Sequence, residues 1–375
     1  MLTLALLAAC VAVAWLDGAP AAVRPGGRLT GDPALGSLFL WLLAGAFAAY
    51  VVGLALVRRG ARFVPVFVLA CVIQLAPLAA PLLVSTDAWT YWSYARVHDP
   101  YRDTPRDDAV SSRYAGRAYV DETSVYGPAF SLLSRPAGLT RSPDAAAWAF
   151  KAAAALCVLA AAWLVSRRRP FAAALVGWNP VVAVHFGGGG HNDAWMMALV
   201  AAALALGERG RVQSAGAAWA TAVLVKWMPL ILLPLRALEA RARRRRVGHL
   251  GFALTAVVVL AAATLLWRLD WLHAIVPLSR DASRRTSYAL PSRLDLPTWP
   301  FVAGYALAYL WLLRAAARGR ARLALAFALL LCCLPYLTVW YVLWPLVLAA
   351  REDDDTATVL TLALCAYLLP QRLLV

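Results

Sequence analysis

The chain has 375 residues, of which 62% are hydrophobic and 15% are charged. This composition excludes an ordinary soluble globular protein and favours a polytopic membrane protein. A net charge of +16 would suggest a nucleic-acid partner in a soluble protein. Here the basic residues form short clusters between apolar runs, so we expect no nucleic-acid partner and interpret the charge as a signal of membrane topology.

The apolar runs predict an all-α polytopic membrane protein with about 13 transmembrane helices, several of them short or broken, in a single domain that covers residues 1–375. A helix needs about 20 mostly apolar residues to cross the hydrocarbon core, and several runs approach that length. In chain order, the predicted helices cover about residues 2–16, 35–57, 63–84, 146–166, 170–187, 194–207, 212–225, 228–238, 247–267, 299–314, 322–336, 338–350 and 356–370.

Four of these segments are too short to cross a membrane alone at about 1.5 Å per residue. Short or broken helices persist at membrane depth only where they lie against other protein or a water-filled cavity. The short segments therefore indicate an internal site. They are residues 194–207, 212–225, 228–238 and 338–350.

Five arginine clusters set the expected orientation. The positive-inside rule assigns all of them to the cytoplasm, and a cytoplasmic N-terminus satisfies that assignment at every cluster. Binding of anionic lipid head groups is a second interpretation of the same residues. Two long loops, about 85–145 and 268–298, then face outward from the cytoplasmic membrane, and we expect the active site on that face. The clusters lie at 58–62, 167–169, 209–211, 241–246 and 318–322.

An aspartate stands where the apolar run 63–84 ends. Asp87 opens a stretch rich in aromatic residues that includes Tyr91 and Tyr94. Aromatic residues are common anchors at a membrane interface, so the tyrosines are either such anchors or a platform for a sugar ring. An ionisable side chain at the membrane boundary, facing the protein, indicates function. We therefore predict that Asp87 accepts a proton.

A run of four glycines, residues 187–190, leads into His191, Asn192 and Asp193. Glycines allow close backbone approach and positive φ, and Asn and Asp are common helix N-caps. A glycine-rich turn that opens onto a helix N-terminus is also an anion site. The segment is therefore either a helix cap or part of a binding site, and we favour the latter.

Lys226 lies in a strongly apolar setting between two short predicted helices. Such a lysine requires an anionic partner or water, so we expect a phosphate or one of the carboxylates, with snorkelling to the interface as the alternative. Tyr126, Trp340 and Tyr341 belong either to an aromatic belt or to a sugar-binding rim. Arginines of the second loop offer bidentate phosphate ligands, and the sequence does not choose among them: Arg280, Arg284, Arg285 and Arg293.

Taken in order, these motifs resemble the C-type, membrane-embedded glycosyltransferases, and most of all the bacterial family 87-like mannosyltransferases that use polyprenyl-phosphate-mannose. The resemblance covers about residues 80–350. It rests on the run from Asp87 to Ala95, Asp99-Pro100-Tyr101, Tyr126-Gly127-Pro128, Trp178-Asn179-Pro180, Gly190-His191-Asn192-Asp193, Lys226-Trp227-Met228-Pro229 and Trp340-Tyr341-Val342-Leu343-Trp344.

The resemblance implies a GT-C fold and an inverting transferase whose catalytic base is Asp87. Some relatives carry a second acid here and bind a metal, whereas this chain continues Asp87-Ala88-Trp89. We therefore expect no metal and no cofactor, with a divalent cation at the remote pair Asp107 and Asp108 as the alternative. Lys226, Arg285 and Arg293 would bind the donor phosphate. The sugar or the acceptor would contact His191, Asn192, Asp193, Tyr91, Tyr94, Tyr126, Trp340 and Tyr341.

The expected partners are the polyprenyl-phosphate-mannose donor, a glycolipid or lipoglycan acceptor, and membrane lipids. A polyprenyl phosphate leaves without protonation, so one base suffices where a glycosidase needs two carboxylates. A flippase or transporter for lipid-linked sugars is the rival from another class, although neither repeated halves nor charged pairs at mid-membrane are evident. Within the enzymes, the rivals are a transferase for another polyprenyl-phosphate sugar, such as arabinofuranose, and a ligase for whole glycan chains.

Overall fold

The computed structural model describes residues 1–26, 31–371 and 373, and this part of the chain contains helices and one isolated β-bridge, between Ala22 and Leu83, but no β-strand. The first half forms α1 (Leu2–Ala14), α2 (Pro33–Arg58), α3 (Phe63–Leu75), α4 (Asp87–Arg96), α5 (Pro128–Ser134), α6 (Pro143–Ser166), α7 (Pro170–Gly177) and α8 (Pro180–Val182). The second half forms α9 (Asp193–Glu208), α10 (Val212–Val225), α11 (Leu232–Ala242), α12 (His249–Trp267), α13 (Ile275–Ser283), α14 (Leu290–Arg293), α15 (Trp299–Ala317), α16 (Leu323–Cys333), α17 (Leu343–Glu352) and α18 (Asp355–Leu368).

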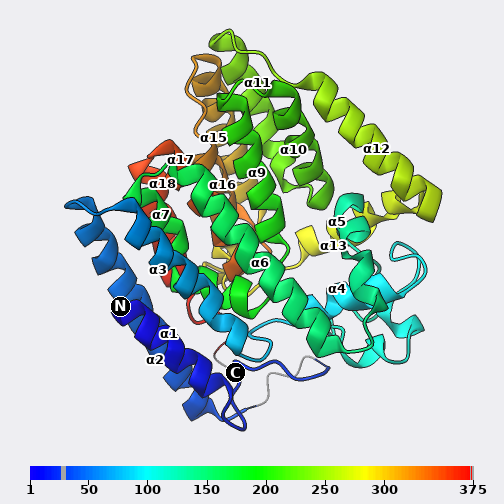
Figure 1. The fold of residues 1–375 in the computed structure, drawn as a ribbon. Helices are drawn as coiled ribbons and strands as arrows, with labels where there is room; N and C mark the ends of the chain where they lie inside the picture. The colour runs from blue at the N-terminus through cyan, green and yellow to red at the C-terminus, as the bar shows by residue number, and fades with distance from the viewer. Residues whose placement is uncertain (27–30, 372, 374–375) are drawn as a thin grey trace.

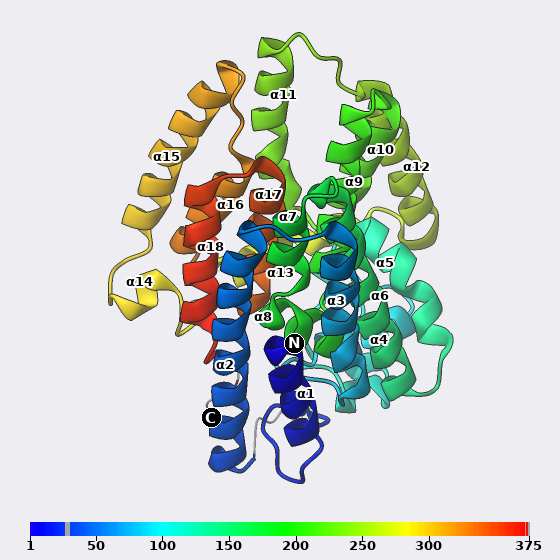
Figure 2. The same ribbon diagram turned by 60° about the vertical axis from the view of Figure 1, so that its left-hand side comes forward.

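Among the described residues, four helices are long and apolar enough to cross a membrane, namely α2, α6, α12 and α15. A fifth candidate is the pair formed by α7 and residues Pro180–Gly188, which bends by 41°. Over half of the apolar window of α6 is buried, compared with 11% for α12 and for α15. Figure 2 shows α12 and α15 at opposite edges of the molecule. The fold is therefore that of an all-α membrane protein with α6 inside and apolar faces outside.

Several helices begin with the same local signal, a polar N-cap followed by proline. Asp32 accepts a hydrogen bond from the N–H of Ala34 at the start of α2, and Ser142 caps α6 in the same way. Asn179 accepts from two N–H groups at the start of α8. Proline suits the first helical position because that N–H has no partner inside the helix.

The helix expected over residues 63–84 is shorter than predicted. Helix α3 ends at Leu75, a 3-10 turn follows over Ala76–Ala79, and the chain is then non-helical up to Asp87. Pro77 and Pro81 explain the difference, since proline lacks an N–H and disrupts a helix interior. Asp87 therefore begins α4 and does not follow directly on a membrane helix.

The long loop expected over residues 85–145 contains helices of its own. Figure 1 shows α4 and α5 together at the side of the molecule below α10 and α12, and both α10 and α12 contact α5. The short segments that we expected inside the protein are α9, α10, α11 and α17. Helix α9 lies between α6 and α10, so it is enclosed by other helices as the sequence predicted.

A buried lysine fixes the non-helical approach to Asp87. Lys151 of α6 is 2% exposed, and its Nζ donates to the carbonyl oxygens of Ala80 at 2.6 Å and Pro81 at 3.2 Å. Nothing in the sequence pattern distinguished this lysine. Its three donors satisfy carbonyls that the broken helix leaves without partners.

The glycine turn 187–190 packs directly against the same approach. The N–H of Leu83 donates to the carbonyl of Gly188 at 3.0 Å. Gly190 has φ +75, and a Cβ there would lie 3.2 Å from the backbone nitrogen of Lys151 and 3.3 Å from the Cβ of Ala88. This turn thus brings α4, α6 and the start of α9 together, and a side chain at Gly190 would separate them.

We predict that Gly190→Ala lowers stability more than Gly210→Ala. Both glycines have positive φ, at +75 and +74. An alanine in this left-handed conformation would therefore lower the free energy of unfolding by about 1–2 kcal/mol at either position. Only Gly190 has neighbours within 4 Å. Thermal unfolding of the two purified variants in detergent measures the difference, and equal melting temperatures would contradict the packing role.

Candidate functional site

The carboxylate of Asp87 is held by three donors. Its Oδ1 accepts from the hydroxyl of Ser85 at 2.8 Å, and its Oδ2 lies 3.0 Å from Nδ1 of His191 and 3.4 Å from the hydroxyl of Tyr91. The Asp87 side chain is 14% exposed, so it reaches a cavity while its donors are mostly buried. The sequence predicted Asp87, His191 and Tyr91 separately, and the structure brings them into contact.

His191 is fixed from two sides. On one side, the backbone of His191 continues from the glycine turn into the start of α9. On the other, the ring of Trp340 stacks on the imidazole with centroids 3.9 Å apart and planes 16° apart. The imidazole is fully buried, and its Nε2 has no hydrogen-bond partner among the described residues. His191 can therefore orient Asp87 through Nδ1, but it does not line a cavity itself.

Tyr91 links Asp87 to the turn before α9. Its hydroxyl donates to Asp87 and accepts from the N–H of Asn192 at 3.3 Å. Burial raises the pKa of the Tyr91 phenol well above its usual value, and the carboxylates of Asp87 and Asp193 raise it further. Tyr91 therefore stays protonated and serves as a donor to Asp87.

Asp193 and Lys226 form an ion pair behind the aromatic residues. The Nζ of Lys226 lies 2.7 Å from Oδ1 of Asp193, which also accepts from the indole N–H of Trp344 at 2.7 Å. The ammonium lies 5.0 Å from the ring centroid of Tyr341. Of the two partners left open by the sequence, the structure provides the carboxylate.

Two cavities meet at Asp87. The polar cavity, about 470 Å³, is also lined by Ser85, Thr86, Arg117, Arg284 and Arg285. The aromatic cavity, about 130 Å³, is also lined by Tyr126, Lys226, Trp340, Tyr341 and Trp344. Tyr119 and Tyr336 line both, with their hydroxyls 3.2 Å apart. Asp87 is therefore accessible from an arginine-rich side and from an aromatic side.

The arginines of the second loop divide into two groups. Arg284 and Arg285 line the polar cavity, and Arg284 also pairs with Glu122 of the first loop at 3.6 Å. Arg293 lies over the ring of Tyr288 at 4.5 Å and is not part of either cavity lining. The geometry thus distinguishes Arg285 from Arg293, which the sequence did not.

Of the remaining predicted site residues, some line a cavity and others do not. Tyr126, Trp340 and Tyr341 line the aromatic cavity. Asn192 is fully buried, and both polar atoms of its amide have no partner among the described residues. Tyr94 donates to the backbone carbonyl of Glu122 at 3.0 Å and lines neither cavity, so it holds the first loop in place.

Several site residues carried no sequence signal that we recognised. Ser85, Arg117 and Tyr119 lie in irregular segments, where residue spacing does not indicate which side chains meet. Trp344 was recognisable only as part of the aromatic motif 340–344. Within the described residues, no group of three or more His, Cys, Asp or Glu side chains could hold a metal ion. The expectation of metal-independent chemistry stays a prediction.

Two protein-family models match more than half of the chain each. The model described as Alpha-(1->6)-mannopyranosyltransferase, N-terminal domain, matches residues 2–242, and the model of Glycosyltransferase family 87 matches residues 125–374. No curated protein and no solved structure matches significantly. The two models overlap over the glycine turn and Lys226, and together they include every residue of both cavities. The chain therefore belongs to glycosyltransferase family 87 and is a GT-C-like mannosyltransferase.

Proposed function

We propose that this protein is an inverting transferase that moves a mannosyl residue from polyprenyl-phosphate-mannose to a lipid-linked glycan or glycolipid. The observation that carries the proposal is the position of Asp87, which lines both cavities while Ser85 and His191 hold its two oxygens. A base in this position can reach a hydroxyl group in one cavity and a sugar carbon at the junction with the other.

The reaction requires one proton transfer and one displacement. Asp87 takes the proton of an acceptor hydroxyl, and the oxygen attacks the anomeric carbon of the donor sugar. The bond between that carbon and the phosphate oxygen breaks, polyprenyl phosphate leaves with the electron pair, and the anomeric configuration inverts. His191, Tyr91 and Ser85 position the carboxylate. Asn192 and Asp193 contribute indirectly. The N–H of Asn192 donates to Tyr91, and Asp193 positions Lys226.

Cations on both sides of Asp87 suit the departing phosphate. Arg285 in the polar cavity and Lys226 in the aromatic cavity would bind the phosphate from two sides. Tyr119 and Tyr336, which line both cavities, lie where the two spaces meet. Positioned cations stabilise the negative charge that develops on the leaving group. Tyr126, Trp340 and Tyr341 offer rings on which a sugar can stack.

The topology completes the proposal. The arginine clusters favour a cytoplasmic N-terminus. The apolar runs favour about 13 transmembrane helices in one domain of residues 1–375. The Asp87 site would then face the outside of the cytoplasmic membrane, where a lipid-linked donor can reach it laterally.

Replacement of the proposed base tests the mechanism. We predict that Asp87→Asn lowers kcat by about 10²–10⁴-fold, since the amide cannot accept the proton. Transfer from labelled polyprenyl-phosphate-mannose by the purified protein measures this loss. Asp121→Asn is the control, because Asp121 is 61% exposed and pairs with Arg106 away from the cavities. A normal rate for Asp87→Asn would refute the assignment.

The two arginines that the sequence could not rank give a matched comparison. We predict that Arg285→Gln raises the KM for the donor by about tenfold or more, because hydrogen bonds to a charged group are worth about 1.5–3 kcal/mol. Arg293→Gln should leave the KM unchanged, since Arg293 packs on Tyr288 outside the cavities. Steady-state kinetics decides, and the reverse order of effects would place the donor elsewhere.

A double substitution separates the two roles of Lys226. Asp193→Asn alone leaves a partly buried ammonium without its partner, and loss of one member of a buried pair costs about 3–5 kcal/mol. Adding Lys226→Met should restore the melting temperature. We expect the double variant still to show a raised donor KM, because the ammonium that contacts the phosphate is gone. Recovery of the KM together with stability would make Lys226 purely structural.

A further inference from the structure

A second charged cavity lies at the end of the molecule away from Asp87. Helix α9 begins at Asp193, beside the candidate active site, and ends at Glu208, which lines this second cavity. The 16 residues of α9 extend over roughly 24 Å at 1.5 Å per residue. The cavity is therefore separate from the catalytic machinery. It lies at the end of the molecule that the positive-inside rule assigns to the cytoplasm.

This cavity, about 360 Å³, is lined by seven arginines and only four carboxylates. We call it the arginine cavity, and it lies among the ends of α9, α11, α16 and α17. With three more arginines than acids around one enclosed space, the lining carries excess positive charge. Topology alone requires basic residues on this side of the membrane, but it does not require that they surround a cavity.

The carboxylates of this cavity already accept hydrogen bonds from other groups of the protein. Glu352 accepts from the backbone N–H groups of Leu323 and Ala324 at 2.8 and 3.0 Å, which caps α16. Asp354 accepts two hydrogen bonds from Arg322, both at 2.8 Å. The acids thus neutralise only part of the arginine charge.

Buried arginine donors stay without partners in this cavity. The Arg351 side chain is 9% exposed and lies 2.5 Å from Glu208, yet its Nη1 is buried with no hydrogen-bond partner among the described residues. The Nε of Arg236 is in the same condition. A buried donor without an acceptor costs about 1–3 kcal/mol, and more when charged, so an anion at this position would be stabilising.

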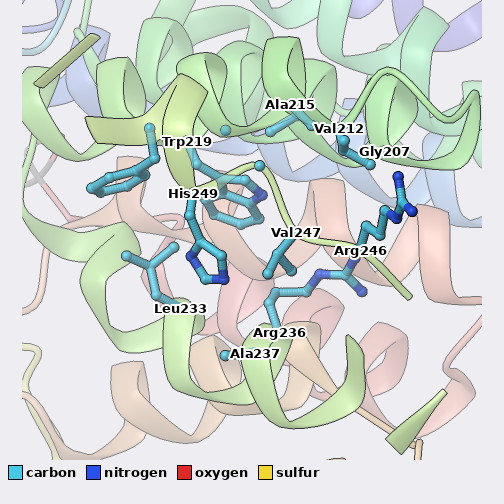
Figure 3. A pocket seen from close by; sticks show the side chains of 14 residues that line it. Gly207, Val212, Ala215, Trp219, Leu233, Arg236, Ala237, Arg246, Val247 and His249 are labelled. Carbon is cyan, nitrogen blue, oxygen red and sulfur yellow. The ribbon is translucent and has the colours of Figure 1, made fainter. Parts of the chain in front are cut away.

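An apolar groove adjoins the arginine cavity. It encloses about 260 Å³, and Arg236 lines both spaces. Figure 3 shows Trp219, Leu233 and His249 on one side of the groove, with Arg236 and Arg246 on the other. A ligand that carries both an anionic group and a hydrocarbon chain can occupy both spaces, whereas a soluble anion would occupy only the arginine cavity.

We propose that the arginine cavity binds the phosphate head group of an anionic phospholipid, with an acyl chain in the adjoining groove. The phosphate oxygens accept from Arg351, Arg236 and the exposed Arg245 and Arg320, which form no side-chain ion pair within the described residues. Arginine suits the role because its planar donors match phosphate geometry. The bound lipid would tie α9 and α11 to α16 and α17, whose far ends carry the residues around Asp193.

The test measures lipid binding to the full chain in detergent by native mass spectrometry and thermal unfolding. The probes are phosphatidylglycerol, phosphatidylcholine with the same acyl chains, and inorganic phosphate. We expect retention of phosphatidylglycerol and a raised melting temperature with that lipid only. Equal effects of phosphatidylcholine would overturn the role of charge. An equal effect of inorganic phosphate at the same concentration would show a soluble-anion site and overturn the lipid.

Matched variants test the location. The double variant Arg245→Gln with Arg320→Gln should weaken phosphatidylglycerol binding on the order of tenfold. The control is Arg241→Gln with Arg318→Gln, which removes the same charge from exposed positions that line neither space. Val247→Asn, at an exposed position in the groove, should weaken binding of the lipid as well. Equal weakening by the control pair, or no effect of Val247→Asn, would overturn the proposed position.

Discussion

The contact between the glycine turn 187–190 and the chain ahead of α4 is the constraint on which the site depends. At Gly187 a Cβ would lie 2.5 Å from the backbone oxygen of Gln74, so the two backbones approach as closely as they can. The approach is possible because proline ends α3 early and Lys151 satisfies the carbonyls that are left exposed by the break. His191 and Asp87, 104 positions apart, meet as a result.

Charge around the site is arranged in layers. Asp193 is almost fully buried; its Oδ1 pairs with Lys226 and accepts from the indole of Trp344, whereas its Oδ2 has no hydrogen-bond partner among the described residues. The side chain of Asp87 is 14% exposed, and Ser85, His191 and Tyr91 contact its carboxylate on the protein side. Arg117, Arg284 and Arg285 line the polar cavity together with this group. A single accessible acid facing several cations suits a substrate that has one hydroxyl to activate and one phosphate to stabilise.

The sequence alone singled out several side chains that the structure brings together at the candidate site. Asp87, His191, Lys226 and Trp340 were recognisable because an ionisable or aromatic residue in an apolar setting requires a reason. Tyr119 was not, since only the folded loops bring its hydroxyl to that of Tyr336.

Helix boundaries followed a similar division. The predicted starts of α2 and α6, at about residues 35 and 146, lie two and three residues after the observed starts at Pro33 and Pro143, whereas the apolar run extended α3 past Pro77. Lys151 was missed because its partners are backbone carbonyls, which no residue pattern encodes. Tertiary contacts of backbone groups are what single-sequence reasoning lacks.

The π-helical turn over Ala183–Gly188 has a consequence for the position of His191. Such a turn holds one residue more than an α-helical turn would, and each residue rotates a helix by about 100°. Loss of one residue there would restore ordinary helical pairing at little cost in apolar burial. It would also swing His191 about a quarter of a turn away from Asp87. The position of His191 relative to Asp87 therefore depends on the number of residues between the Asn179 cap and His191, as well as on the glycines of the turn.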